Sequence, residues 1–195
     1  MSGERLDSPH CDGLVFTLGD QSFVANVAIV LDIMQFIGPD VPHVDGAIGL
    51  DLLYDHAVTI LPRKELIIES DASLATRIAR AQELPMRLVK DAEGVSISVD
   101  GAVPTPAGMA WFELDSGNGG SLVVANHIAP LLGLPVDAGA PIESGFSLAN
   151  GIRVEGKIRT KDLIMDGNIG AQFLNHWALT LDLQRDRAWL APCCS

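Results

Sequence analysis

Asp115, Ser116 and Gly117 form the stretch of the sequence with the clearest capacity for chemistry. Asp115 ends an alternating segment, AWFELD, and all three residues lie within the run WFELDSGNGGSLVV at residues 111–124. A glycine two residues after the acid lets the chain turn tightly and brings backbone N–H groups toward the carboxylate. If a matching loop faced this one, the two acids could not both ionise, so one would hold a proton while the other acted as a base. Such a pair can activate a water molecule and protonate a leaving amine.

The acid stands at the end of a predicted strand. In AWFELD, Trp111 and Glu113 fall on one face, as expected for a half-buried strand. Residues 95–99 (VSISV) alternate in the same way. Residues 121–134 read as a strand that passes into a short helix, with a glycine near the end of that helix. These patterns predict a mostly β protein with a few short helices.

An internal repeat organises the chain. Residues 45–60 read DGAIGLDLLYDHAVTI, and residues 166–181 read DGNIGAQFLNHWALTL. Each copy predicts a glycine turn, a short helix and then a β-rich run, and in the second copy Ile169, Phe173 and Trp177 have helical spacing. The copies match without a gap at these pairs: Asp45 and Asp166, Gly46 and Gly167, Ile48 and Ile169, Gly49 and Gly170, Leu53 and Leu174, Ala57 and Ala178, Thr59 and Thr180.

The repeat extends upstream as a predicted hairpin in each copy. Residues 14–30 resemble residues 145–160, because each has a short polar turn between two strand-like runs. In the first copy a longer insert separates this hairpin from the glycine turn. Between the copies, SLATRIARAQEL predicts a short helix that Pro85 ends.

The combination of motifs resembles the retropepsin-like aspartyl proteases, and the duplication is similar to the bacterial two-lobe members. The resemblance rests on ELDSG (113–117) followed by DGNIGAQFL (166–174), in the order strand, Asp-Ser-Gly, strand and helix, hairpin, glycine turn. It implies acid-protease-like closed β-barrel lobes and an internally duplicated fold. It divides the chain into a partial first lobe over residues 1–70, a connector over 71–94 and a complete second lobe over 95–195.

The same resemblance implies the roles of particular residues. Asp115 would be the catalytic acid, Ser116 and Gly117 would support its loop, and Ile169 and Gly170 would pack behind it. The family implies hydrolysis of peptide bonds, a peptide or protein substrate, and no metal or organic cofactor. Similar bacterial proteins are often exported, which implies an extracytoplasmic site such as the periplasm. The chain departs from the family pattern at Asn118-Gly119-Gly120 and at Asn168, and neither departure is expected to touch the acid.

The first copy raises the question of a partner for Asp115. The acid lies 51 residues before Asp166, and the same interval before Asp45 falls ahead of residue 1. The first copy is therefore expected to lack its acid loop. A missing N-terminal segment, the other product of a cleaved precursor, or the Asp115 of a second subunit could supply the second acid.

Two other interpretations of the motif remain open. Asp-Ser-Gly is also good turn chemistry, so Asp115 could simply end a strand. The chain could also be a non-catalytic, peptide-binding relative of the proteases that has lost the second acid. Asp45 and Asp166 both precede a glycine in a turn, which indicates a structural role for each.

Composition excludes several classes of partner. The 195 residues carry a formal net charge of −12, and their 13 Lys and Arg residues are scattered, which argues against nucleic acid. No apolar run reaches the roughly 20 residues that a membrane-spanning helix needs. The five histidines show no metal-ligand spacing.

Overall fold

The computed structural model describes residues 8–37, 42–62, 65–90 and 96–193. The chain divides into two compact units. Unit 1 comprises Met1–Tyr54 and Lys90–Ile97, and unit 2 comprises Asp55–Val89 and Ser98–Ser195.

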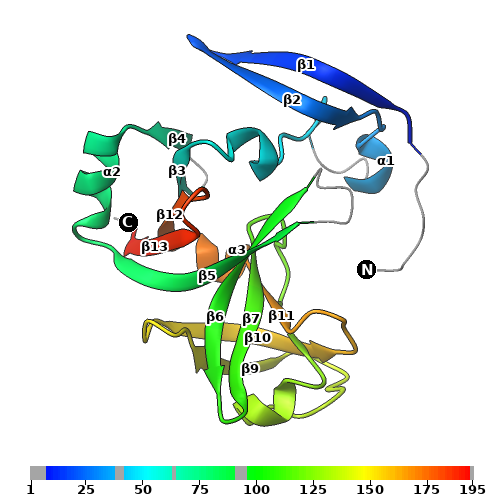
Figure 1. The fold of residues 1–195 in the computed structure, drawn as a ribbon. Helices are drawn as coiled ribbons and strands as arrows, with labels where there is room; N and C mark the ends of the chain where they lie inside the picture. Colours follow the sequence, from blue (N-terminus) through cyan, green and yellow to red (C-terminus); the bar gives the residue numbers. More distant parts are fainter. Residues whose placement is uncertain (1–7, 38–41, 63–64, 91–95, 194–195) are drawn as a thin grey trace. The chain divides into compact units, whose positions relative to one another are not determined.

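Unit 1 is built on an antiparallel hairpin of β1 (His10–Leu18) and β2 (Gln21–Ile29) (Figure 1). Leu18 pairs with Gln21, so the connection is a two-residue turn that begins at Gly19. Gly19 has φ 59°, a conformation that favours glycine and suits the twist of a tight hairpin. Two short helical elements follow: α1 (Met34–Ile37) and η1 (Leu50–Leu53).

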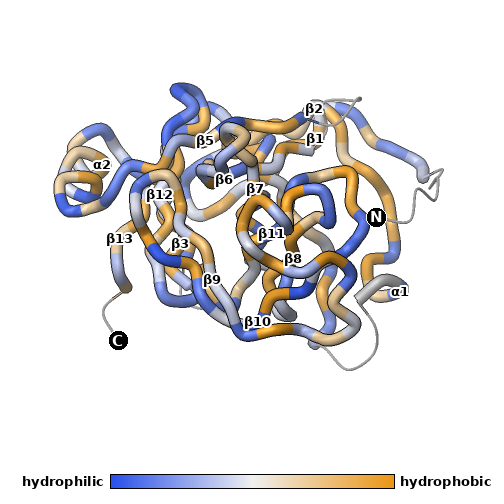
Figure 2. Tube along the Cα trace, turned by 90° about the horizontal axis from the view of Figure 1, so that it is seen from below, coloured by the Kyte–Doolittle hydropathy of each residue, from blue (hydrophilic) through white to orange (hydrophobic). Residues whose placement is uncertain are grey.

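Unit 2 holds one large sheet, in which β6 and β7 form a long antiparallel hairpin (Figure 1). The strand order is β4-β3-β12-β13-β5-β6-β7-β11-β8-β10-β9. Buried hydrophobic residues lie on most strands of the sheet, among them Phe112 on β7, Val124 on β8, Ile169 on β11 and Leu181 on β12, and orange stretches mark hydrophobic residues along the trace (Figure 2). The elements are β3 (Ala57–Leu61), β4 (Glu65–Glu69), α2 (Asp71–Ile78), β5 (Gln82–Lys90), β6 (Ile97–Thr105), β7 (Gly108–Asp115), β8 (Leu122–Ala125), η2 (Ala129–Leu132), β9 (Ile142–Ser147), β10 (Arg153–Lys161), β11 (Gly167–Gly170), α3 (Ala171–Leu174), β12 (Trp177–Asp182) and β13 (Arg187–Pro192).

The mostly β class with short helices is confirmed, but the closed barrel is not found among the described residues. Their larger sheet has two ends, β4 and β9, so it stays open. The predicted boundaries at 1–70, 71–94 and 95–195 stay a prediction. The compact units follow another division, because α2 and β5 from the predicted connector lie in unit 2 and β5 joins the sheet.

Several local predictions can be compared with the elements. The strand and short helix expected at 121–134 are β8 and η2, and Gly133 ends η2 with φ 71°. The helical spacing of Ile169, Phe173 and Trp177 is misleading, because only Phe173 lies in α3. Ile169 belongs to β11 and Trp177 begins β12, so strand pairing overrides the periodicity.

The two copies of the repeat meet at equivalent residues. β3 and β12 pair antiparallel with Thr59 opposite Thr180, the same position of each copy. β4 flanks β3 on one side, and β13 flanks β12 on the other. The pairing therefore relates β3 to β12 by a local two-fold axis that passes between the two threonines. This geometry supports the internal duplication.

A buried hydrogen-bond network surrounds this axis. The Thr59 hydroxyl donates to Glu69 Oε1 at 2.7 Å and lies 2.9 Å from the Thr180 hydroxyl oxygen. Arg77 Nε donates to the same Glu69 oxygen at 3.0 Å. Thr59 is fully buried and Glu69 is nearly so. A buried carboxylate depends on such donors, so Thr59 is the more sensitive of the two threonines.

We expect Thr59→Val to lower the free energy of unfolding by about 1–3 kcal/mol, because it removes a donor from a buried carboxylate without changing the volume much. Thr180→Val is the matched control, since it leaves the Thr59–Glu69 bond in place, and it should cost about 0.5–1.5 kcal/mol. Urea unfolding of both variants measures the difference. An equal loss of unfolding free energy in the two variants would contradict the greater importance of the Thr59 hydroxyl.

Candidate functional site

Asp115 is the last residue of β7 and is positioned by a parallel neighbour, β11. The register places Ile169 opposite Leu114 and Gly170 opposite Asp115. β11 also pairs antiparallel with β8, so it lies between β7 and the strand that follows the Asp-Ser-Gly loop. The end of β7, which carries Asp115, is therefore held on one side by the glycine turn of the second repeat copy. The structure brings together the two motifs that lie about fifty residues apart in the sequence.

The loop after Asp115 turns back onto the acid. Gly117 donates its backbone N–H to Asp115 Oδ1 at 2.9 Å, and Asn118 donates its own to the Asp115 carbonyl oxygen at 3.2 Å. A Cβ atom at Gly117 would come within 3.1 Å of Asp115 Oδ1. Ser116 and Gly117 are exposed, whereas Asp115 is half-buried. Gly117 thus contacts the carboxylate, whereas the supporting role of Ser116 stays a prediction.

Gly170 and Ile169 lie against this loop from the other side. Ile169 is fully buried, and the Ala171 N–H donates to the Asn118 carbonyl oxygen at 2.8 Å. A Cβ atom at Gly170 would overlap that same carbonyl oxygen. Glycine at this position is therefore required by the close approach of β11 to the loop.

Asn168 binds the acid directly, which corrects the expectation that it stands away from Asp115. Its Nδ2 donates to Asp115 Oδ2 at 3.0 Å and to Glu113 Oε2 at 3.0 Å. Its Oδ1 accepts from Asn118 Nδ2 at 2.7 Å. An ionised carboxylate can only accept hydrogen bonds. Asn168 therefore points its Nδ2 atom toward the two carboxylates and its Oδ1 atom toward Asn118. One side-chain amide thus links two carboxyl groups on neighbouring positions of one strand face.

Glu113 belongs to the site, although the sequence interpretation gave it no role. Alternation along β7 places it on the same face as Asp115, and that period-2 signal was available in the sequence. Asp100 of β6 pairs with Glu113 across the sheet, so these acids form a short row with Asp115. Asn168 lies at the position of Ala47 in the first copy, so the repeat carried no signal for it.

Burial raises the pKa of Glu113 above its ordinary value. The hydrogen bond from Asn168 lowers this pKa, whereas the charges of Asp115 and Asp100 raise it. Burial also raises the pKa of Asp100, although the hydrogen bond and charge of Arg87 oppose the shift. Glu113 and Asp100 therefore hold their protons to a higher pH than exposed carboxyl groups do.

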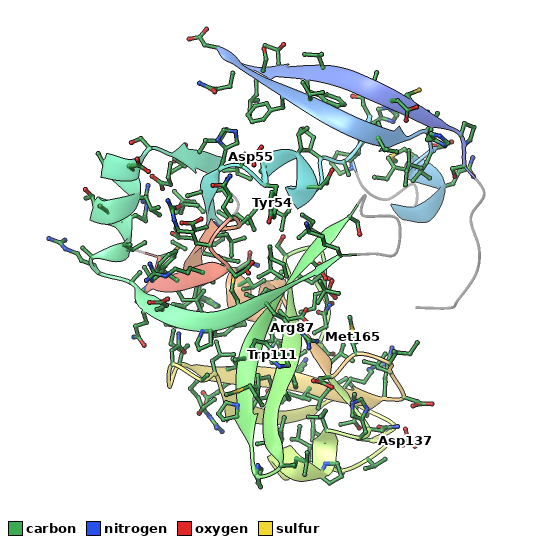
Figure 3. All side chains as sticks on the ribbon, viewed as in Figure 1. Tyr54, Asp55, Arg87, Trp111, Asp137 and Met165 are labelled. Carbon is green, nitrogen blue, oxygen red and sulfur yellow. The ribbon has the colours of Figure 1, made fainter. Side chains whose placement is uncertain are left out.

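Arg87 closes the row on its far side. Its guanidinium donates to Asp100 Oδ2 at 2.9 Å and lies 5.2 Å from the centre of the Trp111 ring. The two side chains lie near one another, Arg87 from β5 and Trp111 from β7 (Figure 3). Arg87 therefore neutralises the negative charge of Asp100. Among the described residues, Glu113 and Asp115 have no such cation in contact and share the hydrogen-bond donor of the Asn168 amide.

Asp166 is structural, in line with its place before a glycine in a turn. Its Oδ2 accepts the Trp111 backbone N–H at 2.8 Å, and its Oδ1 lies 3.1 Å from His127 Nε2. Its backbone oxygen accepts the Ala125 N–H at 2.9 Å. These bonds attach the turn to β7 and to the end of β8. The matching Asp45 in unit 1 has a side chain that is 98% exposed.

A largely apolar pocket of about 410 Å³ opens beside the acid loop in unit 2. Ser116 and Leu114 line it from the loop and β7, so it begins one residue from Asp115 on each side. Its size suits one large side chain or a few small ones of a bound peptide. The remaining lining residues are Ile60, Pro62, Ala171, Leu174, Asn175, Trp177 and Leu179.

Comparisons with known proteins add little. No family model matches the chain, and no curated protein matches it. Among solved structures, soybean basic 7S globulin, which has a pepsin-like fold, aligns with a TM-score of 0.43 and 14% identity. The alignment covers 69% of this chain and 50% of the globulin, so the chain spans about half of that protein. A likeness at this level carries no inference about activity.

No described group of three or more His, Cys, Asp or Glu residues could hold a metal ion. No described helix has the length and apolar character needed to cross a membrane.

We expect Glu113→Gln to stabilise the protein increasingly as the pH rises. A raised pKa means that the folded state binds the Glu113 proton more tightly than the unfolded state does. The contribution of this proton to the stability of the fold is complete below the ordinary pKa of about 4.3. It is lost as the pH rises through the pKa that Glu113 has in the folded state. Glutamine remains neutral, so the Tm difference between variant and wild type should grow from about pH 3 to about pH 7.

Glu143→Gln serves as the control for this measurement, because Glu143 is exposed on β9. Its Tm difference from the wild type should stay nearly constant over the same range. A constant difference for Glu113→Gln as well would contradict the raised pKa.

Proposed function

We propose that the chain takes part in aspartic-type hydrolysis of peptide bonds, with Asp115 as one of two acids. The observation that carries the proposal is the environment of Asp115. The carboxylate ends a strand in the sheet, accepts hydrogen bonds from the Gly117 N–H and the Asn168 amide, and lies beside an apolar pocket. A carboxylate held in this way is fixed in position and has no need to reorganise during a reaction.

In the proposed reaction, Asp115 and a second carboxyl group share one proton across a bound water molecule. The ionised acid takes a proton from the water, whose oxygen attacks the peptide carbonyl, and the protonated acid donates to the carbonyl oxygen. The acid that took the water's proton then gives it to the leaving amine as the C–N bond breaks, and the other acid takes back a proton from the hydroxyl groups of the tetrahedral intermediate, so the pair again holds one proton. The second acid comes from a segment outside this chain, or from a second copy that presents its own Asp115.

The substrate in this proposal is an extended peptide. Backbone hydrogen bonds along a strand-like ligand and one pocket per side chain are a common way of selecting peptides. The pocket beside Ser116 would accept an apolar side chain next to the bond that is cleaved, because Leu114, Leu174 and Trp177 line it.

A non-catalytic, peptide-binding module is the second candidate. One observation favours it: the 195 residues contain a single Asp-Ser-Gly sequence. In this case the same pocket and strand ends would bind a peptide without cleaving it. A homodimer that pairs the two Asp115 residues is the third arrangement, and native mass spectrometry distinguishes it because it requires a dimer.

We expect Asp115→Asn to lower the cleavage rate of a mixed peptide library by about 100-fold or more, because the general base is removed. Asp162→Asn is the matched control, since it makes the same change at an exposed acid outside the site. The measurement is mass spectrometry of the products over a range of pH, with thermal unfolding to show that each variant is folded. Unchanged cleavage by Asp115→Asn would contradict catalysis at this residue, and a wild type that binds peptides without cleaving them would favour the second candidate.

A further inference from the structure

Backbone groups of the loop after Asp115 set the orientation of the Asn168 amide. The Asn118 side-chain oxygen accepts the Gly120 N–H at 3.0 Å, and the Asn118 side-chain nitrogen donates to the Ser121 carbonyl oxygen at 3.2 Å. A backbone N–H can only donate and a carbonyl oxygen can only accept, so these two groups allow one orientation of the Asn118 amide. In that orientation Asn118 Nδ2 donates to Asn168 Oδ1 at 2.7 Å, which leaves Asn168 Nδ2 facing the carboxylates. The direction of the donor at Asp115 therefore follows from the loop backbone.

The main chain of Asn118 is fixed as well as its side chain. Its N–H donates to the Asp115 carbonyl oxygen at 3.2 Å, and its carbonyl oxygen accepts the Ala171 N–H at 2.8 Å. A Cβ atom at Gly170 would lie 3.0 Å from the Asn118 side-chain amide, so this amide packs directly on the backbone of β11. Asn118 is therefore a rigid link between the acid loop and the strand that carries Asn168.

Asp115 is held at both of its carboxylate oxygens. The Gly117 N–H donates to Oδ1 at 2.9 Å, and Asn168 Nδ2 donates to Oδ2 at 3.0 Å. The terminal torsion of an aspartate has a broad energy minimum, so a single hydrogen bond would leave the carboxylate free to rotate. Donors at both oxygens fix its plane. Since an ionised carboxylate offers about four lone-pair directions, two remain for a water molecule or a substrate.

Glu113 is bound to the same amide nitrogen. Its Oε2 lies 3.0 Å from Asn168 Nδ2, and Asp115 Oδ2 lies at the same distance from that nitrogen. A side-chain amide nitrogen carries two hydrogens, so each of them has one carboxyl acceptor. The two carboxyl groups are therefore close neighbours on one face of β7, and the charge of each acts on the other.

Other charged groups near Glu113 come from the neighbouring strands. Asp100 of β6 pairs with Glu113, and Arg87 of β5 forms an ion pair with Asp100 at 2.9 Å. Asp166, which precedes β11, acts on Asp100. Burial raises the pKa of Glu113, and among the neighbouring charges that of Asp115 contributes more than that of Asp100. Glu113 is therefore coupled most strongly to Asp115.

We propose that Asn168 is the positioning residue of Asp115 in the proposed hydrolysis, and that Asn118 sets its direction. Glu113 is a third acid, linked to the catalytic carboxylate through the same amide. When Glu113 ionises, it places a negative charge beside the two acids that share a proton, which favours retention of that proton. Glu113 thus extends cleavage to higher pH. These roles rest on the proposed function of Asp115, whereas the hydrogen-bond chain can be tested without any cleavage.

The first test follows the titration of Glu113 by carbon NMR of the full chain with isotope-labelled glutamate, in which Glu113→Gln identifies the signal. Asn168→Ala installs the residue that the first repeat copy has at this position, and it should raise the pKa of Glu113 because a donor to the carboxylate is lost. Asp115→Asn should lower the pKa of Glu113, because a neighbouring negative charge is lost. Asn126→Ala is the matched control, since Asn126 donates to the Asp137 carboxylate outside this chain of hydrogen bonds, and it should leave the titration unchanged.

The second test measures cleavage of the peptides that the wild type cleaves. Asn168→Ala should lower kcat about tenfold or more and change KM by less than about twofold, because Asp115 loses its orientation while the pocket beside Ser116 stays intact. Asn118→Asp should give a loss of the same order, because an acceptor at this position draws the Asn168 N–H groups away from the acid. Glu113→Gln should lower the pH above which cleavage falls. Thermal unfolding shows that each variant is folded.

The results separate the positioning role from the proposed function. An unchanged Glu113 titration in both Asn168→Ala and Asp115→Asn would overturn the coupling. An equal kcat in the wild type and Asn168→Ala would overturn the positioning role. Titration shifts as expected in a wild type that cleaves no peptide would contradict the function proposed for Asp115, and would reduce Asn168 to a structural link.

Discussion

The parallel pairing of β7 with β11 is the constraint on which the site depends. It brings the glycine turn of the repeat to the end of the strand that carries Asp115, and it leaves no space for a Cβ atom at Gly170. The same pairing places Asn168 where its amide reaches both Asp115 and Glu113. The position of Asn168 and the orientation of the carboxylates therefore follow from the strand register, and the loop conformation depends on the close approach of Gly170 to Asn118.

Duplication explains the rest of the architecture. The equivalent strands β3 and β12 pair about a local axis between Thr59 and Thr180, and a buried hydrogen-bond network stabilises this pairing. The second copy is completed by β6, β7 and β8, which bury its apolar positions. The first copy keeps the hairpin and the glycine turn but exposes the equivalent residues.

Much of this arrangement could be predicted from the sequence, because the repeat and strand alternation are local signals. The strand that ends at Asp115, the hairpins and the short helix after β8 follow from alternation and turn residues. The helix expected through Ile169 and Trp177 was wrong, since β-pairing on both sides outweighs a spacing of four. The role of Asn168 was missed because it depends on strand register, which no local pattern specifies.

The most direct test of catalytic function is the ratio of two affinities measured by calorimetry. One ligand is a peptide that the protein binds, and the other is the same peptide with a hydroxyl-bearing tetrahedral carbon in place of the scissile amide. A site that stabilises a tetrahedral intermediate should bind the second ligand about 100-fold or more tightly, with Asp115→Asn abolishing the difference. Equal affinities in the wild type would contradict the account and leave a peptide-binding module.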